Sequence, residues 1–153
     1  MAHNLSALTQ SATPPEGLTV QELASYGRYQ YKKRFKPFPR EDDKNIADAI
    51  YFMDLNEYKN TDVSELSCGQ IQHARIAMCM AQNTDIIILD EPTTFLDLSF
   101  KTEVLKDIKK ISDSSHKTVI TVLHDLSQAS FLVDNIIVMK KGKLLKLAHP
   151  MKL

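Results

Sequence analysis

The chain has 153 residues, 43% of them hydrophobic and 25% charged, which fits one globular domain with a packed core. Nineteen basic residues balance nineteen acidic ones, so no overall charge draws the chain to nucleic acid or to an anionic membrane. The longest clear apolar run, at residues 86–89, is too short to cross a membrane, and the first ten residues lack a signal-peptide pattern.

The first half of the chain is predicted to be helical. Residues 1–18 are expected to be an irregular lead-in, and Thr19 is expected to cap a short helix, with Glu22 three residues later completing a capping box. A second helix is predicted over about residues 40–55, and Gly69 opens a third. The apolar residues at helical spacing are Val20, Leu23 and Ala24, then Ile46, Ile50 and Met53, then Ile76, Ala77 and Met80.

The second half is predicted to alternate strands and helices. Four aliphatic residues at 86–89 indicate a strand buried on both faces. Strand–helix–strand units of this length favour a parallel sheet with right-handed crossovers. The further expected elements are a helix lined by Val104, Leu105, Ile108 and Ile111, a strand over Thr118–Leu123, a short helix after Asp125, a strand over Ile136–Met139, a turn at Lys141–Gly142 and one more edge strand over Lys143–Leu147.

Two carboxylates follow the predicted strand at residues 86–89, at the end where open parallel sheets place their ligands. Asp90 is placed to help hold a magnesium ion beside nucleotide phosphates. Glu91 can polarise an attacking water as a general base. A strand that ends in an ordinary polar turn is the alternative, but four aliphatics followed by Asp-Glu-Pro favour the catalytic interpretation.

Two further motifs carry polar groups that fit a phosphate. In Leu66-Ser67-Cys68-Gly69-Gln70, a serine and a glycine at a helix N-terminus offer a hydroxyl and free N–H groups, although an ordinary helix cap has the same pattern. His124 follows the strand that ends at Leu123, where it can reach a terminal phosphate, although most single histidines are structural.

These motifs resemble those of the ABC ATPase nucleotide-binding domain. LSCGQ matches the signature motif, ILDEP the Walker B strand with its catalytic glutamate, Asp97 in TFLD the D-loop, and His124 in VLHD the switch histidine. Gln10 resembles the Q-loop glutamine, and the resemblance covers about residues 8–147. Short matches at Gly17–Val20 and Gly27–Tyr29 resemble the branch that serves iron–siderophore and cobalamin importers.

The resemblance implies an α/β fold: a partial P-loop NTPase (RecA-like) parallel sheet with helices, plus the helical subdomain of ABC ATPases. The helical subdomain with the signature is expected at about residues 13–80, and the later part of the RecA-like core at about 81–153. The implied partners are a membrane permease and a second ATPase subunit, with the chain at the cytoplasmic face of the cell membrane and no nucleic acid bound.

The resemblance also implies a role for each matching residue, with ATP and Mg²⁺ as ligands. Asp90 and Gln10 act on the metal, Glu91 and His124 in catalysis, and Asp97 at the dimer interface. The signature residues of one subunit complete the ATP site of the other. Those residues are Ser67, Gly69 and Gln70.

One motif of the family does not occur in this sequence. A P-loop requires GxxxxGK[ST], and the four glycines, at 17, 27, 69 and 142, do not form it. Because that loop supplies much of the positioning and charge stabilisation, we expect little or no ATPase activity from the chain alone. A core without the family's opening strands is also expected to expose a sheet edge and apolar faces.

Three functions therefore remain open: an energy-coupling ATPase subunit of an importer, a non-enzymatic chain that binds an intact subunit or a permease, and a soluble non-transport ABC ATPase. Only about 55 residues separate Gln10 from Ser67, without the heptads of a repair-type coiled coil, which argues against the third. The basic and aromatic stretch between Arg28 and Arg40 fits single-stranded nucleic acid, but with zero net charge a solvated loop or a permease contact is the better interpretation.

Overall fold

The computed structural model describes residues 4–10, 15, 17–31, 39–115, 117–125, 130 and 133–149. The α-helices are α1 (Val20–Tyr26), α2 (Arg40–Phe52), α3 (Cys68–Ala81) and α4 (Leu98–Ser115), with three 3-10 turns at Tyr29–Tyr31, Asn56–Tyr58 and Val63–Glu65. The strands are β1 (Leu5–Leu8), β2 (Ile86–Asp90), β3 (Thr118–Val122), β4 (Ile136–Lys140) and β5 (Lys143–Ala148). The short helix predicted after Asp125 falls on residues 126–129, outside the described part.

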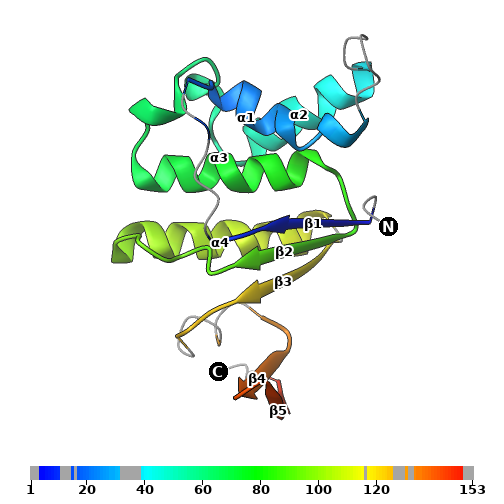
Figure 1. Ribbon diagram of the computed structural model, residues 1–153, viewed down its shortest axis with the longest axis vertical. Coiled ribbons are helices and arrows are strands. Elements are labelled where there is room, and N and C mark those ends of the chain that lie inside the picture. The colour runs from blue at the N-terminus through cyan, green and yellow to red at the C-terminus, as the bar shows by residue number, and fades with distance from the viewer. Residues whose placement is uncertain are drawn as a thin grey trace.

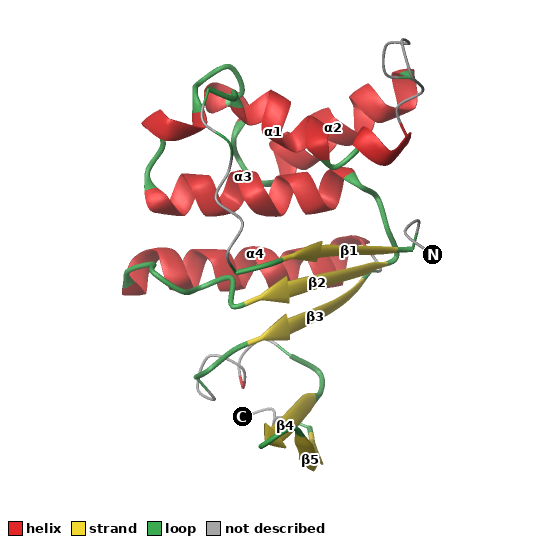
Figure 2. Cartoon of the chain, viewed as in Figure 1, coloured by secondary structure: helices red, strands yellow, loops and turns green. Residues whose placement is uncertain are grey.

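The elements form layers, with α3 between α1 and α2 on one side and the sheet with α4 on the other (Figure 1). Figure 2 shows by colour that α1, α2 and α3 lie together in space, while the parallel strands lie beside α4. One apolar cluster runs through both, because Ile76 of α3, Ile87 of β2 and Val104 of α4 are all 0% exposed and belong to it. This cluster fixes the sheet against the helices and so fixes the strand ends that carry the polar motifs.

The three helices predicted in the first half are confirmed, and two of them begin with the expected caps. The Thr19 side chain accepts a hydrogen bond from the Glu22 N–H, and the Glu22 carboxylate accepts one from the Thr19 N–H at 2.8 Å. Ser67 and Gln70 make the same reciprocal pair at the start of α3. Each box satisfies N–H groups that the first turn of a helix leaves without a partner.

The first strand corrects the expectation of an irregular lead-in. Leu5–Leu8 forms β1, which pairs in parallel with β2 in the register Leu5–Ile86 to Leu8–Leu89. Four residues with a single large buried side chain, Leu8, give almost no pattern to detect in a sequence. The segment is a strand because it pairs with β2. A contact with a distant segment, and not the local sequence pattern, therefore determines its secondary structure.

The sheet has the order β1-β2-β3 and is parallel throughout, as predicted, but β2 is not buried on both faces. Ile87 and Leu89 are fully buried, whereas Ile86 and Ile88 on the other face are only half-buried. Ile120 on β3, the register neighbour of Ile88, is 49% exposed. The helices therefore cover one face of the sheet, and the other shows apolar side chains at the surface, as expected from the sequence.

The last two strands differ from the prediction in their pairing. β4 and β5 exist at the expected positions but pair with each other in an antiparallel hairpin, separate from the parallel sheet (Figure 1). The turn between them places Lys141 and Gly142 at φ 49° and 73°, the left-handed conformation that a tight hairpin requires. A short hairpin turn favours antiparallel pairing, because a parallel partner needs a long crossover.

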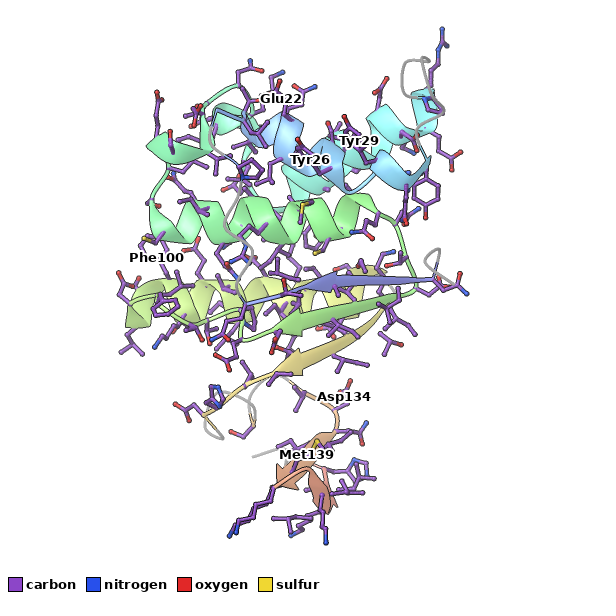
Figure 3. The ribbon with its side chains drawn as sticks, in the orientation of Figure 1. Glu22, Tyr26, Tyr29, Phe100, Asp134 and Met139 are labelled. Atoms are coloured by element: carbon purple, nitrogen blue, oxygen red, sulfur yellow. The ribbon has the colours of Figure 1, made fainter. Side chains whose placement is uncertain are left out.

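Arg28 corrects the interpretation of the basic and aromatic stretch as a solvated loop. Its side chain is buried, and its Nε donates to the Asp42 Oδ1 of α2 at 2.7 Å, while Nη1 donates to the Gln82 carbonyl at 2.8 Å. The guanidinium therefore joins α2 to the end of α3. Tyr26 and Tyr29 stack nearby with ring centroids 5.2 Å apart (Figure 3). The rest of the stretch, residues 32–38, lies outside the described part.

Within the described residues, no helix is long and apolar enough to cross a membrane.

Candidate functional site

The parallel sheet brings three of the predicted polar residues together at the carboxyl ends of its strands. Leu8 of β1 lies beside Leu89 of β2 in the strand register, and Leu89 lies beside Thr121 of β3. Because the three strands run in the same direction, the residues that follow them leave the sheet together. The three residues are Gln10, Glu91 and His124.

Glu91 is the centre of this group. Its Oε2 accepts a hydrogen bond from Gln10 Nε2 at 2.6 Å and another from the Thr94 hydroxyl at 3.0 Å. Its Oε1 contacts His124 Nε2. Three side chains from three segments therefore hold one carboxylate, and both of its oxygens are engaged.

The backbone at Glu91 contributes to this orientation. The residue has φ 50°, the left-handed conformation that is uncommon for a residue with a side chain. Its N–H donates to the Val122 carbonyl of β3 at 3.2 Å, and its own carbonyl accepts from the Thr94 N–H at 3.2 Å. The chain thus turns sharply at the end of β2 and points the carboxylate toward the end of β3. Unusual backbone conformations of this kind gather at functional sites.

The contacts lower the pKa of the Glu91 carboxyl below its usual value. The hydrogen bond from His124 is the largest cause, with smaller contributions from Thr94, from the charge of His124 and from Gln10, while burial acts in the opposite direction. The carboxyl is therefore ionised at neutral pH. The Glu91 side chain is 15% exposed and that of His124 is 76% exposed, so solvent reaches the site from the histidine side. The carboxylate is placed to accept a proton, and the exposed imidazole to donate a hydrogen bond to a ligand that approaches from solvent.

Asp90, the last residue of β2, supplies the second carboxylate. It is half-buried, and its register partner is Val122 of β3. Gln10 uses its amide nitrogen on Glu91, which leaves its amide oxygen as the atom that can face a cation. Carboxylate and amide oxygens are the hard donors that Mg²⁺ prefers, so these two residues fit the metal. The described residues contain no group of three or more His, Cys, Asp or Glu side chains placed to enclose an ion.

The signature residues form a second group at the start of α3. The Ser67 hydroxyl accepts from the Gln70 N–H at 3.3 Å, and Gln70 Oε1 accepts from the Ser67 N–H at 2.9 Å. These hydrogen bonds run within the group and not to Glu91 or its partners. The Ser67 O–H and the first-turn N–H groups of Cys68 and Gly69 are the donors that such a helix start offers to an anion.

Gly69 has a packing role that sequence reasoning missed. It is buried under the ring of Phe100, near the start of α4 (Figure 3). A Cβ at this position would lie 2.3 Å from Phe100 Cδ1, so any larger residue displaces the ring. The aromatic residue at 100 carried no motif by which sequence reasoning could have found it.

Asp97 lies in the loop between β2 and α4, where its Oδ1 accepts from the Phe100 N–H at 3.0 Å and so caps α4. Beside it, Phe95 is 90% exposed with φ 65°, and Leu98 is 79% exposed. Apolar side chains held outward in a loop and at the start of the helix that follows it are typical of a contact surface.

Two more residues support the site without having been predicted. Thr94 donates to Glu91. The available signal was its spacing of three residues from the glutamate, across a turn that contains Pro92. Arg75 of α3 donates from Nη2 to the Thr9 carbonyl at 2.7 Å, just before Gln10. That contact reaches across 66 residues of sequence, so no local pattern could predict it.

Comparisons with known proteins agree with these motifs. The sequence profile of a family described as "ABC transporter" matches residues 1–94. The chain is 38% identical over 150 residues to the petrobactin import ATP-binding protein FpuD of Bacillus anthracis, an alignment that covers 98% of this chain and 55% of that protein. It is 36% identical over 150 residues to the ferric enterobactin transport ATP-binding protein FepC of Escherichia coli, which covers 98% of this chain and 55% of that protein.

A solved structure shows the same fold. The ATP-binding cassette MJ0796, in a post-hydrolysis state with bound ADP and Pi, superposes with a TM-score of 0.76 at 26% identity over 98% of this chain and 64% of that one. The chain spans about half the length of the curated relatives it matches.

Proposed function

Because the chain belongs to the ABC transporter family, we propose that it acts in the ATP-binding subunit of an importer for iron–siderophore complexes or similar metal chelates. The relatives described above are named for the import of petrobactin and of ferric enterobactin, which supports this class of cargo. Transport of this kind couples ATP hydrolysis to a permease. We place the subunit at the cytoplasmic face of the membrane, bound to a permease and to a second ATPase subunit.

The observation that carries the proposal is the Glu91 carboxylate held among Gln10, Thr94 and His124 at the carboxyl end of the sheet. In this proposal Glu91 takes a proton from the attacking water, and His124 donates a hydrogen bond to the terminal phosphate. Gln10 links the site to the permease contact.

Magnesium, when bound with ATP, supplies the charge that neutralises the phosphates. Asp90 and Gln10 are the residues of this chain that would hold it through oxygen atoms. The start of α3 acts on the nucleotide of the second subunit, where Ser67 donates its O–H and Gly69 and Gln70 shape the helix start. Asp97 and the outward Phe95 lie on the loop that we propose faces the same subunit.

The test is magnesium-dependent ATP binding and turnover, measured by calorimetry and phosphate release, for the chain alone and mixed with an intact ATPase subunit of a related importer. We expect little or no turnover from the chain alone, because GxxxxGK[ST] does not occur in its sequence. In the mixture we expect turnover at the composite site, where the intact subunit supplies the phosphate-binding loop and this chain supplies its signature, and Ser67→Ala is expected to slow that turnover by about tenfold. Glu91→Gln, which keeps the size of the side chain, is expected to remove any residual turnover of the chain alone. Thr102→Val on the exposed surface of α4 is the matched control.

A second candidate is a non-enzymatic role, in which the chain folds and binds an intact subunit or a permease without hydrolysing ATP. The missing phosphate-binding motif favours it. Binding to the intact subunit without any turnover by the chain alone, and with a mixed turnover that Ser67→Ala leaves unchanged, would support this role over the catalytic one. A soluble ABC ATPase without a permease is the weakest candidate, because the described residues between Gln10 and Ser67 form only short helices. Failure to bind an intact subunit in ATP and magnesium would remove the mixed-dimer proposal.

A further inference from the structure

We propose that Thr94 is a positioning residue that orients the Glu91 carboxylate toward His124. This inference rests on the proposed function for its catalytic meaning, but its structural content is independent of ATP. Thr94 Oγ1 donates to Glu91 Oε2 at 3.0 Å, while the other oxygen, Oε1, contacts His124. A donor on one oxygen fixes the plane of the carboxylate and therefore the direction in which the second oxygen points.

The turn after β2 holds the Thr94 hydroxyl at a fixed position relative to Glu91. The Thr94 N–H donates to the Glu91 carbonyl at 3.2 Å, which closes a tight turn over residues 91–94. Pro92 and Thr93 inside this turn are both buried. The hydroxyl and the carboxylate thus belong to one rigid unit, and their contact depends on no distant segment.

The other two partners of Glu91 are less constrained. Gln10 and His124 are exposed, and each belongs to a segment that leaves the sheet. Both are also the side chains that the proposed function assigns to the ligand. When they turn toward a nucleotide, Thr94 is the remaining donor to Glu91 and keeps the carboxylate at the end of β3, instead of letting it rotate into solvent.

The experiment is nitrogen-15 NMR of the histidine rings in the full chain, with the His124 signals assigned by their loss in His124→Gln. The variants are Thr94→Val, which removes the hydroxyl but keeps the shape, and Thr94→Ser, which restores the hydroxyl. In Thr94→Val we expect the ratio of Glu91-bonded to free His124 rings to fall by about tenfold, the factor that corresponds to losing a hydrogen bond to a charged group. In Thr94→Ser we expect the wild-type signals.

Thr102→Val is the matched control, because its hydroxyl donates to the Leu98 carbonyl on α4, away from the site. Unfolding midpoints of all variants establish that the fold is intact. Unchanged His124 signals in a folded Thr94→Val variant would overturn the inference, as would a failure of Thr94→Ser to restore them. If the chain binds no Mg-ATP in any mixture, the proposed function fails, while a His124 signal that depends on Thr94 still establishes the positioning role.

Discussion

The helical layer buries its apolar side chains, whereas the strand region leaves several of its apolar side chains exposed. In the helices, Val20, Ala24 and Ile76 are 0% exposed, and the apolar faces meet one another across α1, α2 and α3. In the strand region, Ile120 on β3 is 49% exposed and Ile137 and Met139 on the hairpin are 63% and 64% exposed. Met139 is labelled on this hairpin in Figure 3.

The difference shows that the helical layer buries its apolar side chains within itself and against the sheet, whereas the strand region does not. Each helix has two neighbouring helices or a sheet to bury its apolar stripe, so its burial needs nothing further. Among the described residues the sheet has helices on one face only, and the hairpin packs mainly on itself. Large apolar areas left at a surface mark a contact surface or a tendency to aggregate. Stability should therefore be concentrated in the helical layer, and the predictions below test that difference.

The largest effect is expected from Asp42→Ala in the helical layer. The variant leaves the buried Arg28 guanidinium without its carboxylate, and breaking a buried ion pair in this way costs about 3–5 kcal/mol of unfolding free energy. Urea unfolding followed by circular dichroism measures the loss. Asp43→Ala, one residue along the same helix and exposed, is the control and should change stability by less than about 0.5 kcal/mol. Equal losses in both variants would show that the Arg28 pair does not hold the helices together.

A pair of isoleucines compares the two regions directly. Ile76→Ala opens a cavity in the fully buried face of α3 and should cost about 2–5 kcal/mol. Ile137→Ala removes the same atoms from a side chain that is 63% exposed on β4 and should cost less than about 0.5 kcal/mol. Both losses are measured by the same urea titration. A large loss at Ile137 would mean that the hairpin face is covered in solution and that the comparison of the two regions is wrong.

The smallest effect concerns the pH dependence of the helix start at Thr19. Hydrogen bonds from Thr19 lower the pKa of the Glu22 carboxyl below its ordinary value. A carboxyl with a lowered pKa in the folded state stabilises the fold above the unfolded pKa, and this contribution is lost as the pH falls from about 5 toward 3. Unfolding midpoints of wild type should therefore fall more steeply over this range than those of Glu22→Gln, which keeps an acceptor but does not titrate. Glu57→Gln, at an exposed position in a 3-10 turn, should keep the wild-type slope.

The sequence alone predicted most of the elements, because their signals are local. Capping pairs at Thr19 and Ser67 and the apolar spacing of the helices follow from hydrogen bonds and periodicity within a few residues. The same holds for the aliphatic run of β2 and for the turn at Lys141. The resemblance of the motifs also identified the family that the sequence profile confirms.

The sequence could also predict that Glu91 and His124 would lie at the same end of the sheet, because each follows a segment predicted as a strand and parallel strands end together. Gln10 was matched only by its resemblance to a family motif, because the strand before it was not predicted. The structure unites these three residues around one carboxylate. Their catalytic roles remain proposals, to be tested by the turnover and NMR experiments.

The tertiary structure alone decided the features that depend on contacts between distant segments. β1 became a strand because β2 offers it an edge, whereas the β4–β5 hairpin closes through a local turn. Phe100 covers Gly69 from another helix, and Arg75 reaches the Thr9 carbonyl across 66 residues of sequence. A sequence specifies propensities over a few residues. The partners that bury, pair or orient a side chain are chosen only when segments far apart in the chain come into contact.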